Sequence, residues 1–286
     1  MKEEIRREIE NYVAAHHQRQ GTTTQWEQPL VGFAEASDPL FAELKRVASP
    51  THALPVDLLP GARTVVAFFL PFEKSVPLSN IAGIPASRQW AQGYIETNAL
   101  IGAVTNHMKS YLESHGHAVA VTPATHNFDT EKLVSDWSHR HVAFIAGLGR
   151  FGQNNMLITA RGCCGRLGSF VTDAALSPDA RGGAEACLHR HDGSCLRCVE
   201  RCVNAALFSD RFDRKQCYAM CLRNGAAFRK MGKADVCGKC LVGLPCSFTD
   251  PVKARLPLAA SRPAPPGISS RNAGRNGAPH RQSTGG

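Results

Sequence analysis

Cysteine is the residue type best suited to chemistry in this sequence, and its distribution is uneven. The chain has 11 cysteines, of which two are adjacent, at Cys163 and Cys164, and the rest lie between Cys187 and Cys246. A reducing compartment disfavours a disulfide framework. Thiolates are soft ligands that suit zinc and iron–sulfur clusters. The distribution therefore predicts a metal or cluster site in the C-terminal half of the chain.

The central motif is Cys-Leu-Arg-Cys-Val-Glu-Arg-Cys at residues 195–202. Its C-x2-C part places two thiolates on one tight loop, and the following C-x3-C spacing turns the third sulfur away. In two-cluster ferredoxins, the last cysteine of a C-x2-C-x2-C-x3-C-P run serves the other cluster. Here Asp192 occupies the position of the first cysteine and Val203 that of the proline. Cys187 is a candidate for the missing thiolate.

A second set of cysteines follows, and pairing the two sets crosswise gives eight thiolates for two [4Fe–4S] clusters. One cluster would take Cys187, Cys195, Cys198 and Cys246. The other would take Cys202, Cys217, Cys237 and Cys240. This pairing leaves Cys163, Cys164 and Cys221 without a cluster.

Two other interpretations of the cysteines stay open. Two C-x2-C knuckles also suit one zinc ion held by four thiolates, and His189 and His191 add nitrogen donors. A zinc-stabilised interaction module would follow, with a scaffold or nucleic-acid function. Zinc leaves Cys202, Cys217 and Cys246 without a role, which favours two clusters. Plain buried thiols are the remaining alternative.

The net charge of +9 does not indicate a nucleic-acid surface, because most of the excess lies near the C-terminus. No acidic residue follows Asp250, whereas six basic residues do: Lys253, Arg255, Arg262, Arg271, Arg275 and Arg281. Two clusters with four thiolates each would offset much of the remaining charge. No secretory signal or membrane-spanning run is visible, so we expect a cytoplasmic protein that does not bind membranes.

The hydrophobic pattern predicts an α/β (α+β) fold. Helices are expected at residues 3–17, 40–47, 88–114 and 136–146, and strands at 64–70 and 118–122. We expect an α/β cofactor and substrate domain at 1–180 and a cluster-binding domain at 181–250. A basic tail at 251–286, rich in Pro, Gly, Ser and Arg, is expected to be disordered.

Residues 147–152 read Gly-Leu-Gly-Arg-Phe-Gly, a literal G-x-G-x-x-G. A dinucleotide site would need a strand, this turn and then a helix. The glycines at 162 and 165 would end such a helix early. A glycine turn that lets the backbone approach a cofactor and a purely structural turn are the other interpretations.

Several segments, taken in order, resemble the epoxyqueuosine reductase family. They are Ser-Asp-Trp-Ser-His-Arg-His at 135–141, the glycine segment at 147–152, Asn-Asn-Met-Leu-Ile-Thr at 154–159 and the cysteine motif at 195–202. The ending Cys-Gly-Lys-Cys…Pro-Cys at 237–246 is similar to that of the family's shorter relatives. The resemblance covers roughly residues 60–248.

The resemblance implies a nitroreductase-like, cobalamin-binding core followed by a ferredoxin-like domain with two [4Fe–4S] clusters. Electrons from a ferredoxin- or flavodoxin-type donor would pass through the clusters to the corrinoid and an organic substrate. Asp136 would be the catalytic proton donor, and Gly147, Gly149, Gly152 and Cys163 would lie beside the cofactor. The family's helical-repeat domain, which helps hold tRNA, is not present in this sequence. A tRNA partner is therefore open, and a small molecule or modified nucleoside is an alternative substrate.

Other roles for these residues remain. Asp136 is also typical of a helix N-cap. His139 and His141 could contact a corrinoid or a phosphate, or could be core or surface histidines. A ferredoxin-type electron carrier without a corrinoid is the alternative to an enzyme.

Overall fold

A four-stranded antiparallel sheet organises the chain. The computed structural model describes residues 1–124 and 128–255. The strands have the order β1-β2-β8-β3, comprising β1 (Leu30–Glu35), β2 (Thr64–Pro71), β8 (Gly165–Thr172) and β3 (Val119–Val121). All three strand pairs are antiparallel, with Phe68 opposite Gly168 in the central pair. The mixed α/β character predicted from the sequence is confirmed.

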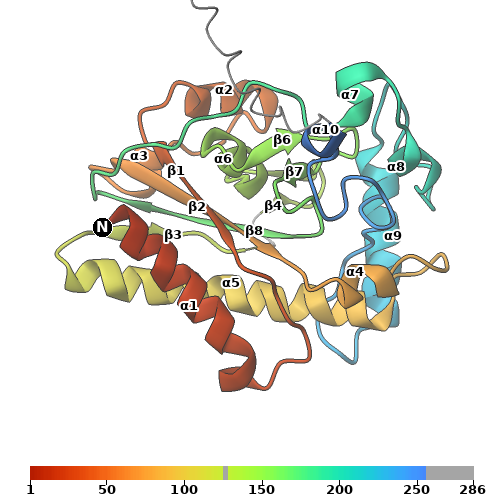
Figure 1. Cartoon of the computed structure of the whole chain (residues 1–286), viewed down its shortest axis with the longest axis horizontal. Helices are drawn as coiled ribbons and strands as arrows, with labels where there is room; N and C mark the ends of the chain where they lie inside the picture. Colours follow the sequence, from red (N-terminus) through yellow and green to blue (C-terminus); the bar gives the residue numbers. More distant parts are fainter. Residues whose placement is uncertain (125–127, 256–286) are drawn as a thin grey trace, which may run out of the picture. The chain divides into compact units, whose positions relative to one another are not determined.

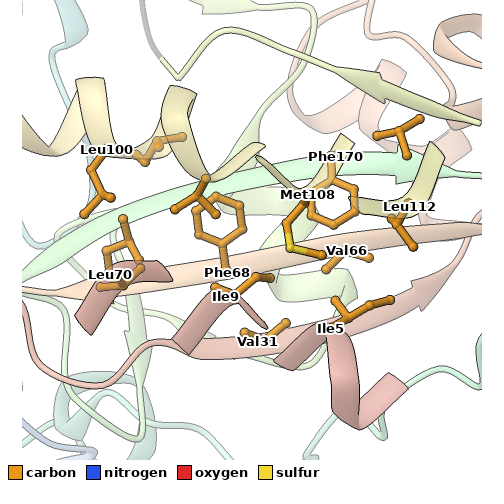
Figure 2. Close-up of a cluster of buried hydrophobic side chains, with 14 of the residues drawn as sticks. Ile5, Ile9, Val31, Val66, Phe68, Leu70, Leu100, Met108, Leu112 and Phe170 are labelled. Atoms are coloured by element: carbon orange, nitrogen blue, oxygen red, sulfur yellow. The ribbon is translucent and has the colours of Figure 1, made fainter. Parts of the chain in front are cut away.

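Both faces of β2 are buried because helices cover each side of the sheet. Val66, Phe68 and Leu70 point to the face covered by α1 (Lys2–Gln20) and α5 (Arg88–Ser114) (Figures 1 and 2). Val65 and Ala67 point to the opposite face. This second face is covered by α2 (Leu40–Val47) and α6 (His139–Ile145), and α3 (Pro55–Leu58) lies near it. Because successive side chains of a strand point to opposite faces, β2 contributes to two separate hydrophobic cores.

The predicted helices and strands are present, with ends that differ by up to three residues. The predicted bounds of α2 and α5 are those observed. Helix α6 begins at His139, not at Asp136, and Ser138 is its N-cap. The reason is tertiary: the indole of buried Trp137 donates to Ser169 at 3.0 Å, and the Ser138 amide donates to His52 at 3.0 Å. These contacts hold the preceding segment out of the helix.

The glycine segment forms a hairpin, so the dinucleotide-binding interpretation is wrong. Strand β6 (Gly149–Phe151) pairs antiparallel with β7 (Leu157–Thr159), and no helix follows the glycines. A side chain at Gly149 would clash with the carbonyl of Ile158 on the paired strand. Close backbone packing by itself therefore explains why this position is a glycine.

The cysteine-rich segment consists of short helices joined by loops. These helices are α7 (Leu188–Asp192), α8 (Arg197–Glu200), α9 (Arg214–Ala227) and α10 (Pro251–Arg255). They gather at one end of the sheet, the end at which α4 (Ser75–Ser79) also lies (Figure 1). Backbone hydrogen bonds from Cys163 to Cys246 and from Cys164 to Ser247 attach the segment to the start of β8.

Two expectations concern the end of the chain. Residues 251–255, which were expected to belong to the tail, form α10, because the Asp250 carboxylate accepts hydrogen bonds from the amides of Val252 and Lys253. The rest of the predicted tail lies outside the described residues.

The predicted domain boundary near residue 180 remains a prediction. Among the described residues, no helix is both long and apolar enough to cross a bilayer.

Candidate functional site

Four cysteines line a small pocket beside α7 and α8, and we call them the first thiol group. They are Cys187, Cys195, Cys198 and Cys246. Cys187 is the N-cap of α7, and Cys198 lies within α8. Burial raises the pKa of the Cys198 thiol to about 12, and the neighbouring thiols contribute to the same shift. Thiols packed this closely can ionise together only if a cationic group compensates their charge.

Five cysteines line a second, larger cavity of about 840 Å³, and we call them the second thiol group. They are Cys202, Cys217, Cys221, Cys237 and Cys240. Cys217 and Cys221 lie one turn apart on α9, with their thiols in hydrogen-bonding contact. Burial raises the pKa of Cys237 and of Cys240. The hydrogen bond from Cys221 lowers the pKa of Cys217, and nearby Arg140 lowers it further.

The structure thus places the eight predicted ligands in two sets of four, and Cys221 joins the second set. Within the described part of the chain, no three Cys, His, Asp or Glu side chains converge closely enough to hold a single metal ion. In a [4Fe–4S] cube each thiolate binds a different iron, so the four sulfurs surround a space and do not meet at one point. The donor set fits such a cube, and iron binding remains a prediction.

Basic and aromatic residues that the sequence did not single out as ligand contacts line the rest of the large cavity. The guanidinium carbon of Arg166 lies 4.3 Å from the centre of the Tyr94 ring. The Tyr94 hydroxyl donates to Asp235 at 3.2 Å. The buried Nε of Arg166 has no hydrogen-bond partner among the described residues. A ligand with an acceptor atom could satisfy this group.

Arg140 brings a second cation to the cavity, on the side of the second thiol group. Its guanidinium donates to the carbonyl of Asn155 at 2.7 Å. Arg140 lines the cavity, and its side chain is therefore exposed to solvent there although protein lies on the other sides. Burial lowers the pKa of Arg140, and thiolates at Cys217 and Cys240 act in the opposite direction. An arginine remains protonated at neutral pH, so positive charge faces these thiols.

Asp136 is exposed, and its carboxylate is engaged at the protein surface. It accepts hydrogen bonds from Ser49 at 3.0 Å and from Thr51 at 2.6 Å. Ser135 and Ser138 line the large cavity on either side of it, whereas Asp136 is absent from the described lining residues. Asp136 does not cap α6 either, because the N-cap of that helix is Ser138. Proton donation by Asp136 remains a prediction.

The two histidines of the Ser-His-Arg-His segment have different environments. His139 is buried and hydrogen-bonded through both ring nitrogens, to Ser169 at 2.8 Å and to Pro123 at 3.0 Å, as in an ordinary core histidine. His141 lines the large cavity and is hydrogen-bonded to Ser138 at 2.8 Å. Burial, and then the charge of Arg140, lowers the pKa of His141 to about 4. His141 is therefore neutral at pH 7.

The predicted cofactor-binding residues are spread over different surroundings. Gly152 lines the small pocket, whereas a Cβ at Gly147 would lie 2.9 Å from the carbonyl of Ala180. Gly149 belongs to the hairpin. Cys163 is buried, with its thiol against that of Cys246 in the first thiol group. Their predicted role beside a cofactor remains a prediction.

Comparison with known proteins identifies the fold. No family model matches this chain, and no curated protein matches it either. Among solved structures, the epoxyqueuosine reductase from Bacillus subtilis matches with a TM-score of 0.52 and 19% identity, over 85% of this chain and 66% of that one. The Streptococcus thermophilus enzyme matches with a TM-score of 0.50 and 16% identity, over 84% and 66%. A catabolic reductive dehalogenase matches with a TM-score of 0.50 and 17% identity, over 79% of this chain and 31% of that one.

These likenesses confirm, at the level of the fold, the resemblance to epoxyqueuosine reductases. The chain spans 66% of the length of the Bacillus subtilis and Streptococcus thermophilus enzymes. At such identities the comparison supports the fold and leaves the activity to be argued from the site.

Proposed function

We propose that this protein is an iron–sulfur oxidoreductase of the epoxyqueuosine reductase type. Two [4Fe–4S] clusters would carry electrons towards a corrinoid in the large cavity, where an organic substrate is reduced. The observation that carries the proposal is the division of the thiols between two adjacent hollows, one small and one large. The fold that goes with this function would be a nitroreductase-like core followed by a ferredoxin-like domain that holds the clusters.

The residues that would hold the clusters follow from the two thiol groups. The first thiol group supplies four ligands without help from another residue. The second supplies Cys202, Cys217, Cys237 and Cys240, with Cys221 as an additional thiol. Asn154 lines both hollows and donates from its side chain to the carbonyl of Cys240 at 2.9 Å. Electrons could therefore pass between two centres that share a wall.

The large cavity suits an organic ligand. Its volume of about 840 Å³ is within the range of protein pockets for small molecules and cofactors. Trp90, Tyr94 and Phe151 give it an aromatic lining, and Arg140 and Arg166 provide charged donors. A corrinoid bound here would supply a strongly reducing cobalt centre. The protein would orient it, keep His141 neutral beside it and stabilise negative charge near it.

Asp136 would serve as proton donor after a movement of its loop. The neighbouring serines already line the cavity, so a rotation of residues 135–138 would bring the carboxyl group to its edge. In the Bacillus subtilis structure, the catalytic loop with its aspartate is swung out of the active site. We propose that the loop with Asp136 is in a comparable position here, where Ser49 and Thr51 bind the carboxylate.

The test begins with iron and acid-labile sulfide, measured per chain on protein purified without oxygen. About eight of each supports two clusters, whereas zinc without sulfide contradicts the redox proposal. A cobalamin titration follows. A shift of the cobalamin absorption spectrum supports the enzyme, and an unchanged spectrum leaves a ferredoxin-type electron carrier.

The role of Asp136 requires its own comparison. Asp136→Asn should retain the clusters and bind cobalamin but lose substrate reduction. Asp210→Asn, which changes an exposed aspartate outside the described cavity lining, is the control. Equal activity of the two variants would exclude Asp136 as the proton donor.

A further inference from the structure

The segment from the last turn of α4 to the start of α5 exposes several large apolar side chains. Leu78 is 52% exposed, Ile81 36% and Ile84 62%. Figure 1 shows this segment leaving α4, projecting outward and returning to α5. Single exposed apolar residues are ordinary, but a group of them on one short segment is typical of an interaction site. We call these three residues the apolar knob.

Hydrogen bonds fix the knob to the loop that carries two thiols of the second group. Lys239, between Cys237 and Cys240, is only 1% exposed, and its ammonium donates to the carbonyls of Asn80 at 2.8 Å and Ala82 at 2.7 Å. The Asn80 side chain donates to the carbonyl of Cys237 at 2.9 Å. Because burying an ammonium is costly unless it is hydrogen-bonded, this attachment is specific.

Arg201 makes a second attachment, at the place where the two thiol groups meet. Its guanidinium donates to the carbonyl of Ile81 at 2.8 Å and to that of Lys239 at 3.3 Å. Arg201 precedes Cys202 in the chain. Cysteines of both groups pack here against Leu207 and Leu244: Cys198, Cys202, Cys240 and Cys246. The knob is therefore attached beside the place where the two thiol groups pack together.

The surroundings of the knob are basic. The amide of Ala86 donates to Asn224 of α9 at 3.2 Å, so α9 and the segment after it adjoin the knob. Residues 214–236 contain six basic side chains and one acidic one, Asp235. Lys74 and Arg88 add positive charge at the two ends of the knob segment. The nearby acids are Glu73, whose carboxylate accepts hydrogen bonds from Ser75, and exposed Glu200.

We propose that the apolar knob is the docking surface for a small, acidic electron-carrier protein. An apolar centre with a basic periphery complements a partner whose acidic surface surrounds its redox centre. One electron would pass from the reduced carrier to a cluster, so that the carrier is oxidised and the cluster reduced. The inference rests on the clusters of the proposed function and adds the site and the charge of the donor.

The experiment measures cluster reduction by two donors under anaerobic conditions. A reduced plant-type [2Fe–2S] ferredoxin, which is acidic, is the protein donor, and dithionite is the small one. The variant carries Leu78→Ser, Ile81→Ser and Ile84→Ser. Val56→Ser is the matched control, because Val56 is 49% exposed on α3. The ferredoxin rate should fall about tenfold in the triple variant only, as for loss of an apolar hot spot, and the dithionite rate should be unchanged.

A second variant and a salt series sharpen the test. Ile84→Asp places a carboxylate on the knob and should slow ferredoxin further by repulsion, and added salt should slow the wild-type reaction. Equal ferredoxin rates in the triple variant and the control would overturn the proposal. A parallel loss with dithionite would also overturn it, because the knob would then only support the clusters.

Failure of the underlying function can be recognised separately. Iron and sulfide are measured on every preparation first, and a wild-type protein without clusters contradicts the proposed function before any donor is added. If the triple variant lost affinity for an RNA stem loop while its ferredoxin rate was unchanged, the knob would be an RNA contact and the docking proposal would be wrong.

Discussion

The two thiol groups differ in what surrounds them. The first lines a pocket of about 20 Å³ whose other walls are glycine, proline, aliphatic side chains and the amides Gln153 and Asn154, with no charged or aromatic side chain in the described lining. The second lies on one wall of a cavity of about 840 Å³ that also contains arginines, aromatic rings and His141. The first group has room for little beyond an inorganic centre, whereas the second adjoins space for a further ligand. Under the proposed function, the first group would be an electron relay and the reaction would take place next to the second.

The charges that surround the thiols also differ between the two groups. The pKa of Cys198 is raised mainly by burial and by the other thiols of its group. In the second group burial likewise raises the pKa of Cys237 and Cys240, but at Cys217 the hydrogen bond from Cys221, and then the nearby charge of Arg140, lowers the pKa. Because a nearby cation stabilises the reduced, more negative form of a cluster, a centre in the second group should be the easier one to reduce. Electron flow towards the large cavity would then be favourable.

The largest expected effect separates the two groups by their iron. Cys198→Ser should lower the iron content from about eight to about four per chain, because it removes a ligand of one cube and leaves the other intact. Cys164→Ser is the control, since Cys164 is buried and hydrogen-bonded to the Leu241 carbonyl at 3.1 Å. Iron analysis and low-temperature electron paramagnetic resonance after reduction are the measurements. An unchanged iron content in Cys198→Ser would break the division into two groups.

The next comparison lies within the second group, which has one thiol more than a cube needs. Cys217→Ser should lose about half of the iron, whereas Cys221→Ser should retain it. Both residues are on one face of α9, so the two variants are structurally matched. Iron content again decides between them. The opposite result would make Cys221 the ligand, and full iron in both single variants would show that either thiol can serve.

The smallest expected effect is on the pH dependence of stability, and it concerns His141 in the lining of the large cavity. The pKa of His141 is about 4 in the folded protein against 6.5 as the ordinary value. Between these values the unfolded chain binds more protons, so stability falls as the pH decreases from about 6.5 towards 4. From pH 7 to pH 5, the free energy of unfolding of the wild type should therefore fall by about 1 kcal/mol more than that of His141→Gln.

Thermal unfolding at the two pH values measures this difference. His115→Gln, at an exposed histidine, is the control. A parallel acid dependence of His141→Gln and the wild type would mean that the imidazole is not held neutral by its surroundings.

Local patterns predicted the longer helices and strand β2 well, but missed several strands and the composition of the cavity. The helix at Arg88–Ser114 was predictable because its apolar spacing repeats over many turns. Strand β8 was not predicted, although it is central, because Gly165 and Gly168 weaken its strand pattern. In the structure a side chain at Gly168 would clash with Phe68 of β2. Such a requirement exists only once the two strands are paired.

The sequence by itself determined that thiols lie in pairs, because C-x2-C spacing brings two sulfurs together within a single loop. It also suggested a grouping of eight cysteines. The four of each set line one of the two hollows, and their binding of iron remains a prediction. Only the tertiary structure decided what faces those thiols. Arg140 of α6 and Arg166 of β8 reach the same cavity as Cys217 of α9, although neither has a local signal. The sulfurs of one loop are neighbours along the chain, whereas the cations of the cavity become neighbours only when the sheet and the cysteine segment pack together.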